Sequence, residues 1–242
     1  MTMVRVLLIA WLGTMTVAAD AVELRGIWKI RGPITLQSKG DTALPFTAMG
    51  RAQFATNRAA IAAGDRSVDL TLRCASPGAP RIMLLNYPFE ILQQADHILF
   101  IFQWNHLFRQ IVMGDQRDPY ILPSAMGYSS GHWEGNALVI TSTDFNARTF
   151  LDGRGLPHSD KLKLTERFHL REGGRILDWK STVEDPEDYT HPWEASAQFE
   201  RLARASLSED VCVDRVAAGG RAIEIQAKRR SATMPPSRSL SQ

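Results

Sequence analysis

Residues 162–184 read LKLTERFHLREGGRILDWKSTVE and contain two strand-like patterns separated by a turn. Both 162–170 and 176–184 are short runs rich in apolar, β-branched and aromatic residues, as is typical of strands. The sequence between them, 171–174, is Arg-Glu-Gly-Gly and carries the glycines typical of a tight turn. The stretch therefore predicts an antiparallel hairpin.

Short runs of the same kind, rich in β-branched and aromatic residues, recur along the chain between turn residues. They cover 67–72, 81–85, 97–104, 108–113 and 137–143. A turn at 134–136 would join a tryptophan-containing strand to 137–143. The alanine-rich stretch 49–63, which Gly64 ends, predicts one short helix. The whole pattern indicates an all-β protein with a meandering antiparallel sheet.

A sheet of eight or more strands removes its free edges most completely by closing into a barrel, which can enclose one small ligand. Gly26-Ile27-Trp28 contains the Gly-x-Trp pattern that closes one end of lipocalin-type barrels. We therefore expect an all-β fold, an antiparallel lipocalin-like (calycin-type) β-barrel with one short helix. A single domain over 22–226 would contain it.

The first 21 residues have the three parts of a secretory signal peptide. Arg5 is positively charged, 6–17 are apolar, and cleavage could follow Ala19 or Ala21. The apolar run is too short to span a bilayer comfortably, and no cysteine follows it to carry a lipid. We expect an exported, periplasmic protein without a stable membrane anchor.

The formal net charge is +2, and the basic tail 227–242 alone contributes +4. The rest of the chain is slightly acidic, so we expect no nucleic-acid partner. The tail combines Ser, Pro and basic residues with few apolar ones, which predicts disorder. The oligomeric state is not predicted by any pattern in the chain.

Cys74 and Cys212 are the only cysteines. In an oxidising compartment they can form a disulfide between the first third of the domain and its end; two separate buried thiols are the alternative. The spacing of His and Cys predicts no local metal site, and no nucleotide loop or other cofactor site is expected. A metal site assembled in space from His106, His132 and His158 is an open alternative.

Several motifs between Cys74 and Trp193 occur in a characteristic order. They are Pro88-Phe89-Glu90-Ile91, His106 with Arg109, Gly131-His132-Trp133-Glu134-Gly135, Gly155-Leu156-Pro157-His158-Ser159-Asp160, Glu166-Arg167-Phe168, and Asp185-Pro186 with Tyr189 and Pro192-Trp193. This order resembles a large family of exported, mostly uncharacterised bacterial proteins to which α-pinene oxide lyase is related. The resemblance implies a cofactor-independent lyase or isomerase that opens a monoterpene epoxide to an aldehyde.

Ring opening of an epoxide requires a proton donor, a base, and apolar walls that exclude water and tolerate a cation. Strand alternation would place His106 and Trp104 on one face, toward the barrel cavity, which makes His106 the first candidate acid or base. His158 lies in a Gly-flanked loop, where Ser159 or Asp160 could orient it. The structural alternative for His106 is a histidine of the core. The structural alternative for His158 is a turn in which Ser159 or Asp160 caps the following strand.

Three carboxylates are further candidates. Glu90 and Glu134 lie in apolar settings that can raise a carboxyl pKa, although salt bridges to Arg109 or Arg167 would use them equally well. Asp115 lies in Gly-Asp-Gln-Arg, where the family resemblance implies Asp-Gly-Arg. The predicted catalytic residues are His106, His158, Asp115 and Glu90. The predicted substrate-binding residues are Trp104, Phe102, Arg109 and Tyr128.

A periplasmic carrier that binds a lipophilic small molecule without transforming it is the rival hypothesis. An enzyme needs at least two titratable groups that converge in the cavity, whereas a carrier needs only an apolar space. In both hypotheses the partner is a small hydrophobic molecule.

The signal-peptide prediction has a direct test. N-terminal sequencing of protein secreted by a bacterial host should begin between Asp20 and Glu23. Periplasmic material that retains Met1 would contradict the prediction.

Overall fold

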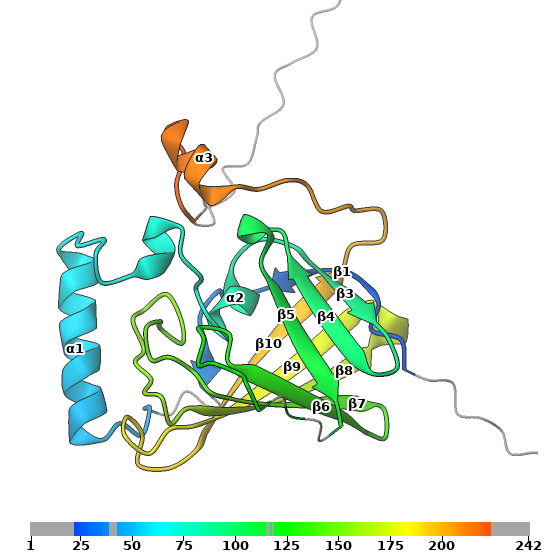
Figure 1. Ribbon diagram of the computed structural model, residues 1–242, viewed down its shortest axis with the longest axis horizontal. Helices are drawn as coiled ribbons and strands as arrows, with labels where there is room; N and C mark the ends of the chain where they lie inside the picture. Colours follow the sequence, from blue (N-terminus) through cyan, green and yellow to red (C-terminus); the bar gives the residue numbers. More distant parts are fainter. Residues whose placement is uncertain (1–21, 39–42, 115–116, 118, 224–242) are drawn as a thin grey trace, which may run out of the picture.

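The structure is a computed structural model that describes residues 22–38, 43–114, 117 and 119–223 (Figure 1). Its strands are β1 (Gly26–Arg31), β2 (Gln37–Ser38), β3 (Phe89–Gln93), β4 (His97–Phe102), β5 (Phe108–Met113), β6 (Tyr128–Glu134), β7 (Ala137–Thr143), β8 (Lys163–Arg171), β9 (Ile176–Glu184) and β10 (Trp193–Arg201). Nine of them form a closed barrel, because β10 pairs with β1, and β2 adds to β10. The predicted all-β barrel is confirmed. The predicted signal peptide and basic tail lie outside the described residues.

One pair of neighbouring strands, β5 and β6, is parallel. Each antiparallel step reverses the strand direction, so a ring of nine strands cannot close with antiparallel pairs alone. The parallel register is short and joins Ile111 to Ser129, Val112 to Ser130, and Met113 to Gly131. A parallel pair needs a long crossover, which the chain supplies between β5 and β6. The expectation of a purely antiparallel barrel is therefore wrong at this pair, the seam of the barrel.

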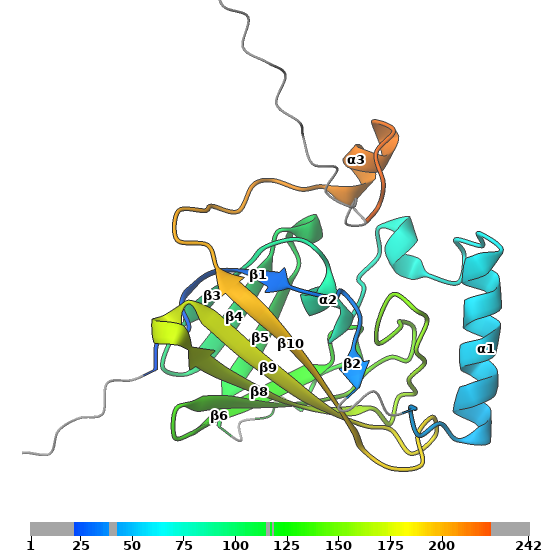
Figure 2. The same cartoon turned by 180° about the vertical axis from the view of Figure 1, so that it is seen from behind.

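Helices are few. They are α1 (Ala48–Ala62), α2 (Arg81–Leu84) and α3 (Cys212–Ala217), with 3-10 turns η2 (Leu70–Arg73), η3 (Trp104–His106) and η4 (Glu172–Gly174). Helix α2 is buried in the core, whereas α1 and α3 lie outside the barrel (Figures 1 and 2). The two views agree that α1 stands beside the barrel, with the segment that joins β7 to β8 between them (Figures 1 and 2). None of the helices in the described part of the chain is long and apolar enough to cross a membrane.

The predicted hairpins and the helix near 49–63 are present. The strands predicted at 108–113, 137–143 and 176–184 match β5, β7 and β9. Two predicted strands are wrong, because 67–72 leads into η2 and 81–85 forms α2. Asp69 explains why 67–72 is not a strand, because its carboxylate accepts a hydrogen bond from the Thr71 amide and caps η2. All four residues of α2 are buried. A short run that is buried on every side shows neither the helical nor the strand periodicity, so its sequence does not distinguish a helix from a strand.

Aromatic side chains fill one part of the barrel interior. The ring of Phe89 lies 5.9 Å from that of Phe100, 5.6 Å from that of Phe102 and 5.2 Å from that of Phe199. The ring of Phe100 in turn meets that of Phe168 at 5.4 Å. Side chains therefore occupy the space in which we expected a ligand.

Trp28 is fully buried where β1 pairs with both β10 and β3. Its indole nitrogen donates to the Leu24 carbonyl at 2.9 Å, and the Arg201 guanidinium lies over its ring, 4.4 Å from the centroid. Arg201 also donates to the Gly174 carbonyl at 2.7 Å. At Gly26, with φ +130°, a Cβ atom would stand only 3.0 Å from the same guanidinium, so the glycine of the Gly-x-Trp pattern makes room for this stack.

A buried polar network joins five strands across the seam. Arg109 of β5 donates to Ser129 of β6 at 3.1 Å and to Ser142 of β7 at 2.7 Å. It also forms an ion pair with Glu166 of β8, which accepts a hydrogen bond from the Trp179 indole of β9 at 3.0 Å. The two charges neutralise each other in the interior, and removal of one would leave the other without compensation.

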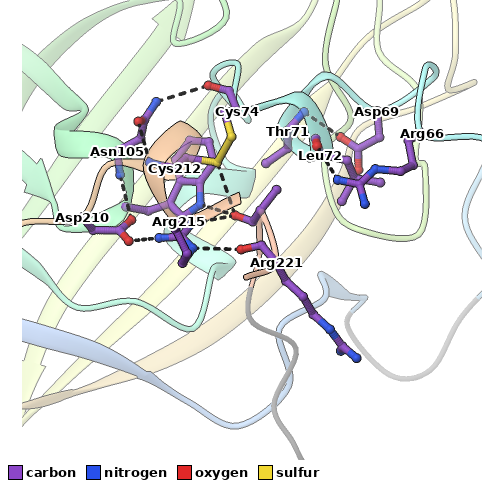
Figure 3. The surroundings of a disulfide bond; sticks show 12 residues. Arg66, Asp69, Thr71, Leu72, Cys74, Asn105, Asp210, Cys212, Arg215 and Arg221 are labelled. Atoms are coloured by element: carbon purple, nitrogen blue, oxygen red, sulfur yellow. Dashed lines mark hydrogen bonds and ion pairs between the residues drawn. A yellow bond between two sulfur atoms is a disulfide. The ribbon is translucent and has the colours of Figure 1, made fainter. Parts of the chain in front are cut away.

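The disulfide Cys74–Cys212 attaches the C-terminal segment to the rest of the fold (Figure 3). Asn105 bridges its two ends, because its side-chain amide donates to the Cys74 carbonyl and its amide oxygen accepts from the Cys212 amide, each at 3.2 Å. The Trp104 indole donates to the Ala222 carbonyl at 2.8 Å. Residues more than 100 positions apart are thus held together.

The seam network predicts unequal effects for two arginines. Arg109→Met should destabilise the protein by about 3–5 kcal/mol, because Glu166 stays buried and uncompensated. Arg167→Met, which removes a surface ion pair with Glu134, should destabilise the protein far less, because water solvates both groups. Arg109→Met combined with Glu166→Met should recover most of the loss in denaturant unfolding. Equal losses for the two single variants would contradict the role of the network.

Candidate active site

The structure separates His106 from the barrel interior. His106 is exposed and belongs to η3, where its Nε2 accepts a hydrogen bond from the Asp210 amide at 3.1 Å. Asn105 and His106 have φ of 54° and 49°, so strand alternation stops before them. The prediction that His106 and Trp104 share a strand face toward a cavity is wrong. Trp104 and Phe102 are buried in the core.

The other predicted residues are dispersed. Glu90 lies on β3 between Phe89 and Ile91, which face the interior, so its own side chain lies on the outer face. Glu134 is exposed and pairs with Arg167, and this hydrogen bond lowers its pKa. The raised pKa expected for Glu134 is wrong, and the alternative of a salt bridge to Arg167 is confirmed. Asp115 lies outside the described residues.

Arg109 and Tyr128 come together at the seam. Both contribute to a cavity of about 570 Å³ whose other walls include Phe108, Leu122 and Met126. The Arg109 side chain is occupied by Glu166 and the two serines described above. Among the described residues, this cavity therefore brings two predicted substrate-binding residues together without His106, His158 or Glu90.

A cavity of about 350 Å³ between α1 and two loops contains His158, and we call it the α1 cavity. One face of α1 supplies Met49, Gln53 and Asn57, which are spaced four residues apart. The opposite wall is lined by Ala147, Thr149, Phe150, Pro157, His158, Glu187 and Asp188. The site is thus assembled from three segments that are distant in sequence.

The start of α1 is anchored to the loop that carries Asp188. Thr47 caps the helix, accepting from the Gly50 amide at 3.0 Å and donating to the Glu187 carbonyl at 2.7 Å. Its amide also donates to the Asp188 carbonyl at 2.9 Å. A Cβ atom at Gly50 would come within 2.2 Å of that carbonyl oxygen, so only glycine allows this close approach. Farther along the helix, Asn57 donates to the Gly155 carbonyl at 2.9 Å.

His158 is held as a neutral base. Only 6% of the residue is exposed, and burial lowers its pKa because the charged form loses solvation. Its Nδ1 lies 3.0 Å from the Ser159 carbonyl, which can only accept, so Nδ1 carries the proton. Nε2 therefore has its lone pair directed at Thr149 Oγ1, 2.9 Å away, and the Thr149 hydroxyl donates to it.

Asp185 positions the loop that carries His158. Its carboxylate accepts from the Ser159 amide at 2.6 Å and from the Ser159 hydroxyl at 2.8 Å. Ser159 thereby turns its carbonyl toward the imidazole. Ser159 rather than Asp160 orients the histidine, and it does so through its backbone.

Asp188 is a carboxylic acid with a shifted pKa. It is 6% exposed, and burial together with the negative charges of Asp185 and Glu187 raises its pKa to about 6. The cavity therefore holds a carboxyl whose pKa is raised beside an imidazole whose pKa is lowered. An acid and a base with opposite pKa shifts in one cavity are a recognised feature of catalytic sites.

Comparisons with known proteins provide no further assignment. The chain matches no family model and no curated protein. Within the described residues, no group of three His, Cys, Asp or Glu side chains is placed to hold a metal ion. The assembled metal site considered for His106, His132 and His158 has no support there.

Sequence reasoning found His158 and missed Thr149 and Asp188. The only local signal for Asp188 is its place in the acidic run Asp185-Pro186-Glu187-Asp188, where neighbouring negative charges favour a raised pKa. Nothing in the local sequence indicates that α1 buries it.

The raised pKa of Asp188 predicts a pH-dependent stability. A folded-state value of about 6 against 3.8 when unfolded favours folding below pH 3.8, and this contribution disappears as the pH rises through 6. Asp188→Asn should therefore stabilise the protein at pH 8 by about 1–3 kcal/mol and change little at pH 4. Asp160→Asn, at an exposed position, is the matched control. Equal effects of Asp188→Asn at both pH values in denaturant unfolding would contradict the shift.

Proposed function

We propose that this protein is a cofactor-independent lyase or isomerase that acts on a small hydrophobic molecule in the α1 cavity. A monoterpene epoxide, α-pinene oxide in particular, is the best specific candidate. The observation that carries the proposal is that a neutral imidazole and a carboxyl of raised pKa line the same cavity. The motif order of the chain supports the choice of substrate class.

The proposed reaction uses each group once. Asp188 donates its proton to the epoxide oxygen, the C–O bond breaks with its electron pair going to oxygen, and a carbocation remains. His158 then accepts a proton from the opened intermediate through Thr149, whose hydroxyl passes its own proton to Nε2 as it takes the new one. That proton comes from the new hydroxyl group, whose O–H electron pair forms the C=O bond of the aldehyde. After shifts within the ring skeleton have moved the cation, a C–C bond to the carbinol carbon breaks and its electron pair neutralises the cation as a C=C bond, so the product is an isomer of the substrate. No electron donor or acceptor is required.

The walls of the α1 cavity suit an apolar substrate. Met49, Ala147, Phe150 and Pro157 contribute apolar surface. The volume of about 350 Å³ is at the lower end of the range for small-molecule sites. A compact bicyclic molecule fits this size better than a long chain does.

We also propose that the barrel is lipocalin-like and that the protein is exported. The Gly-x-Trp of β1 and the stack of Arg201 on Trp28 support the lipocalin-like barrel. The nine strands and the parallel pair differ from lipocalins, which have eight strands. The disulfide Cys74–Cys212 is compatible with an oxidising compartment.

Incubation with α-pinene oxide, with aldehyde measured by gas chromatography, tests the function. His158→Gln and Asp188→Asn should each reduce kcat by about 10²-fold or more, the usual size of a general acid–base contribution. His132→Gln, at an exposed position outside the cavity, should leave turnover unchanged. Turnover should fall about tenfold per pH unit above pH 6, because Asp188 loses its proton there.

Other outcomes would exclude the proposal. Loss of activity in His106→Gln with full activity in His158→Gln would locate the chemistry elsewhere. Binding of α-pinene oxide without aldehyde formation at any pH between 4 and 8 would favour the carrier.

A further inference from the structure

A third cavity, of about 520 Å³, is separate from the α1 cavity in all its lining residues, and we call it the arginine-rimmed cavity. Its apolar walls come from Ile34, Ile61, Leu72, Leu84, Leu85, Ala222 and Ile223. These residues belong to the segment after β1, the end of α1, η2, α2 and the C-terminal segment. An apolar space between so many elements has the character of a ligand site.

The buried charges in its wall neutralise each other. Arg81 makes two hydrogen bonds to the Asp69 carboxylate, at 2.8 and 2.7 Å, and both side chains are buried. The Arg81 Nε is buried without a hydrogen-bond partner among the described residues. Because Arg81 lines the cavity, an oxygen atom of a bound ligand can accept a hydrogen bond from this Nε–H group.

Exposed positive charge borders the apolar walls. Arg154 is held by the buried Asp152 carboxylate and by the Leu36 carbonyl, each at 2.8 Å. Arg66 donates to the Leu72 carbonyl at 2.8 Å, and Arg221 extends from the segment after α3 (Figure 3). Arg66 and Arg221 are both exposed, so their guanidinium groups can bind an anion while keeping contact with water.

The disulfide fixes one wall of the cavity. Arg215 of α3 donates to the carbonyls of Arg221 and Ala222, at 2.8 and 2.9 Å, so α3 holds the segment that includes Ile223. Cys212 attaches α3 to Cys74, which directly follows η2 (Figure 3). Two walls of the cavity, η2 and the C-terminal segment, are therefore covalently joined.

We propose that the arginine-rimmed cavity binds an amphipathic anion, a carboxylate with a medium-length aliphatic chain. The chain lies among Ile34, Ile61 and Leu84, and the carboxylate lies at Arg66 and Arg221. A neutral hydrocarbon would leave the arginines unused, and a small hydrophilic anion would leave the apolar walls exposed to water. This site is additional to the α1 cavity and does not depend on the proposed lyase activity.

Isothermal titration calorimetry with decanoate tests the site on the purified protein. Decanoate should bind at least tenfold more tightly than decanol or acetate, because only decanoate has both the chain and the charge. Arg66→Gln combined with Arg221→Gln should weaken binding at least tenfold. Arg58→Gln combined with Arg204→Gln removes the same charge from exposed positions outside the cavity and should leave decanoate binding unchanged.

The disulfide provides a second arm. Cys74→Ala combined with Cys212→Ala should weaken decanoate binding, since the C-terminal wall loses its attachment, and circular dichroism would verify that the barrel is intact. Equal binding of decanol, no loss in the Arg66/Arg221 variant, or no heat with decanoate would each overturn the proposal. Decanoate binding that appears only in a variant ending at Ile223 would assign the cavity to the chain's own C-terminal residues and overturn it as well.

Discussion

The closure of a nine-stranded ring is the constraint on which the rest of this structure depends. An odd number of strands requires one parallel pair, and here β5 and β6 share only three register positions. Arg109 strengthens this seam, because it joins β5 to β6, β7 and β8 through Ser129, Ser142 and Glu166. The ion pair of Arg109 with Glu166 is buried, so desolvation offsets much of its Coulomb attraction. We expect it to specify this arrangement of strands as well as to add to the free energy of folding.

Because side chains fill the barrel interior, the candidate sites lie outside the barrel. Phe89 and its aromatic neighbours occupy the lumen, and the cavities form where α1 and the loops pack against the barrel. The helix serves both proposed sites, since Met49, Gln53 and Asn57 face the α1 cavity and Ile61 faces the arginine-rimmed cavity. A helix docked through Gly50 and Gly155 thus creates surfaces that the barrel alone lacks.

The buried ionisable groups fall into two classes. Arg81 with Asp69, and Arg109 with Glu166, are paired charges that compensate each other's desolvation. Asp188 differs, because the charged neighbours that act on it are the acids Asp185 and Glu187, and its pKa rises to about 6. A buried acid that keeps its proton up to about pH 6 costs less stability below that pH than a buried carboxylate, and it remains available for proton transfer.

Local sequence determined the hairpin of 162–184, three strands to the residue, the position of α1, and a possible cysteine pair, because alternation and turn residues act within a few positions. Tertiary structure alone decided the parallel seam, the exposure of His106 and the placement of Asp188 and His158 in one cavity. Strand alternation predicted the wrong face for His106 because backbone geometry changed at Asn105. The pKa of Asp188 depends on burial by a helix that begins 140 residues earlier, near Thr47 and its contact with Glu187, and no local pattern contains that information.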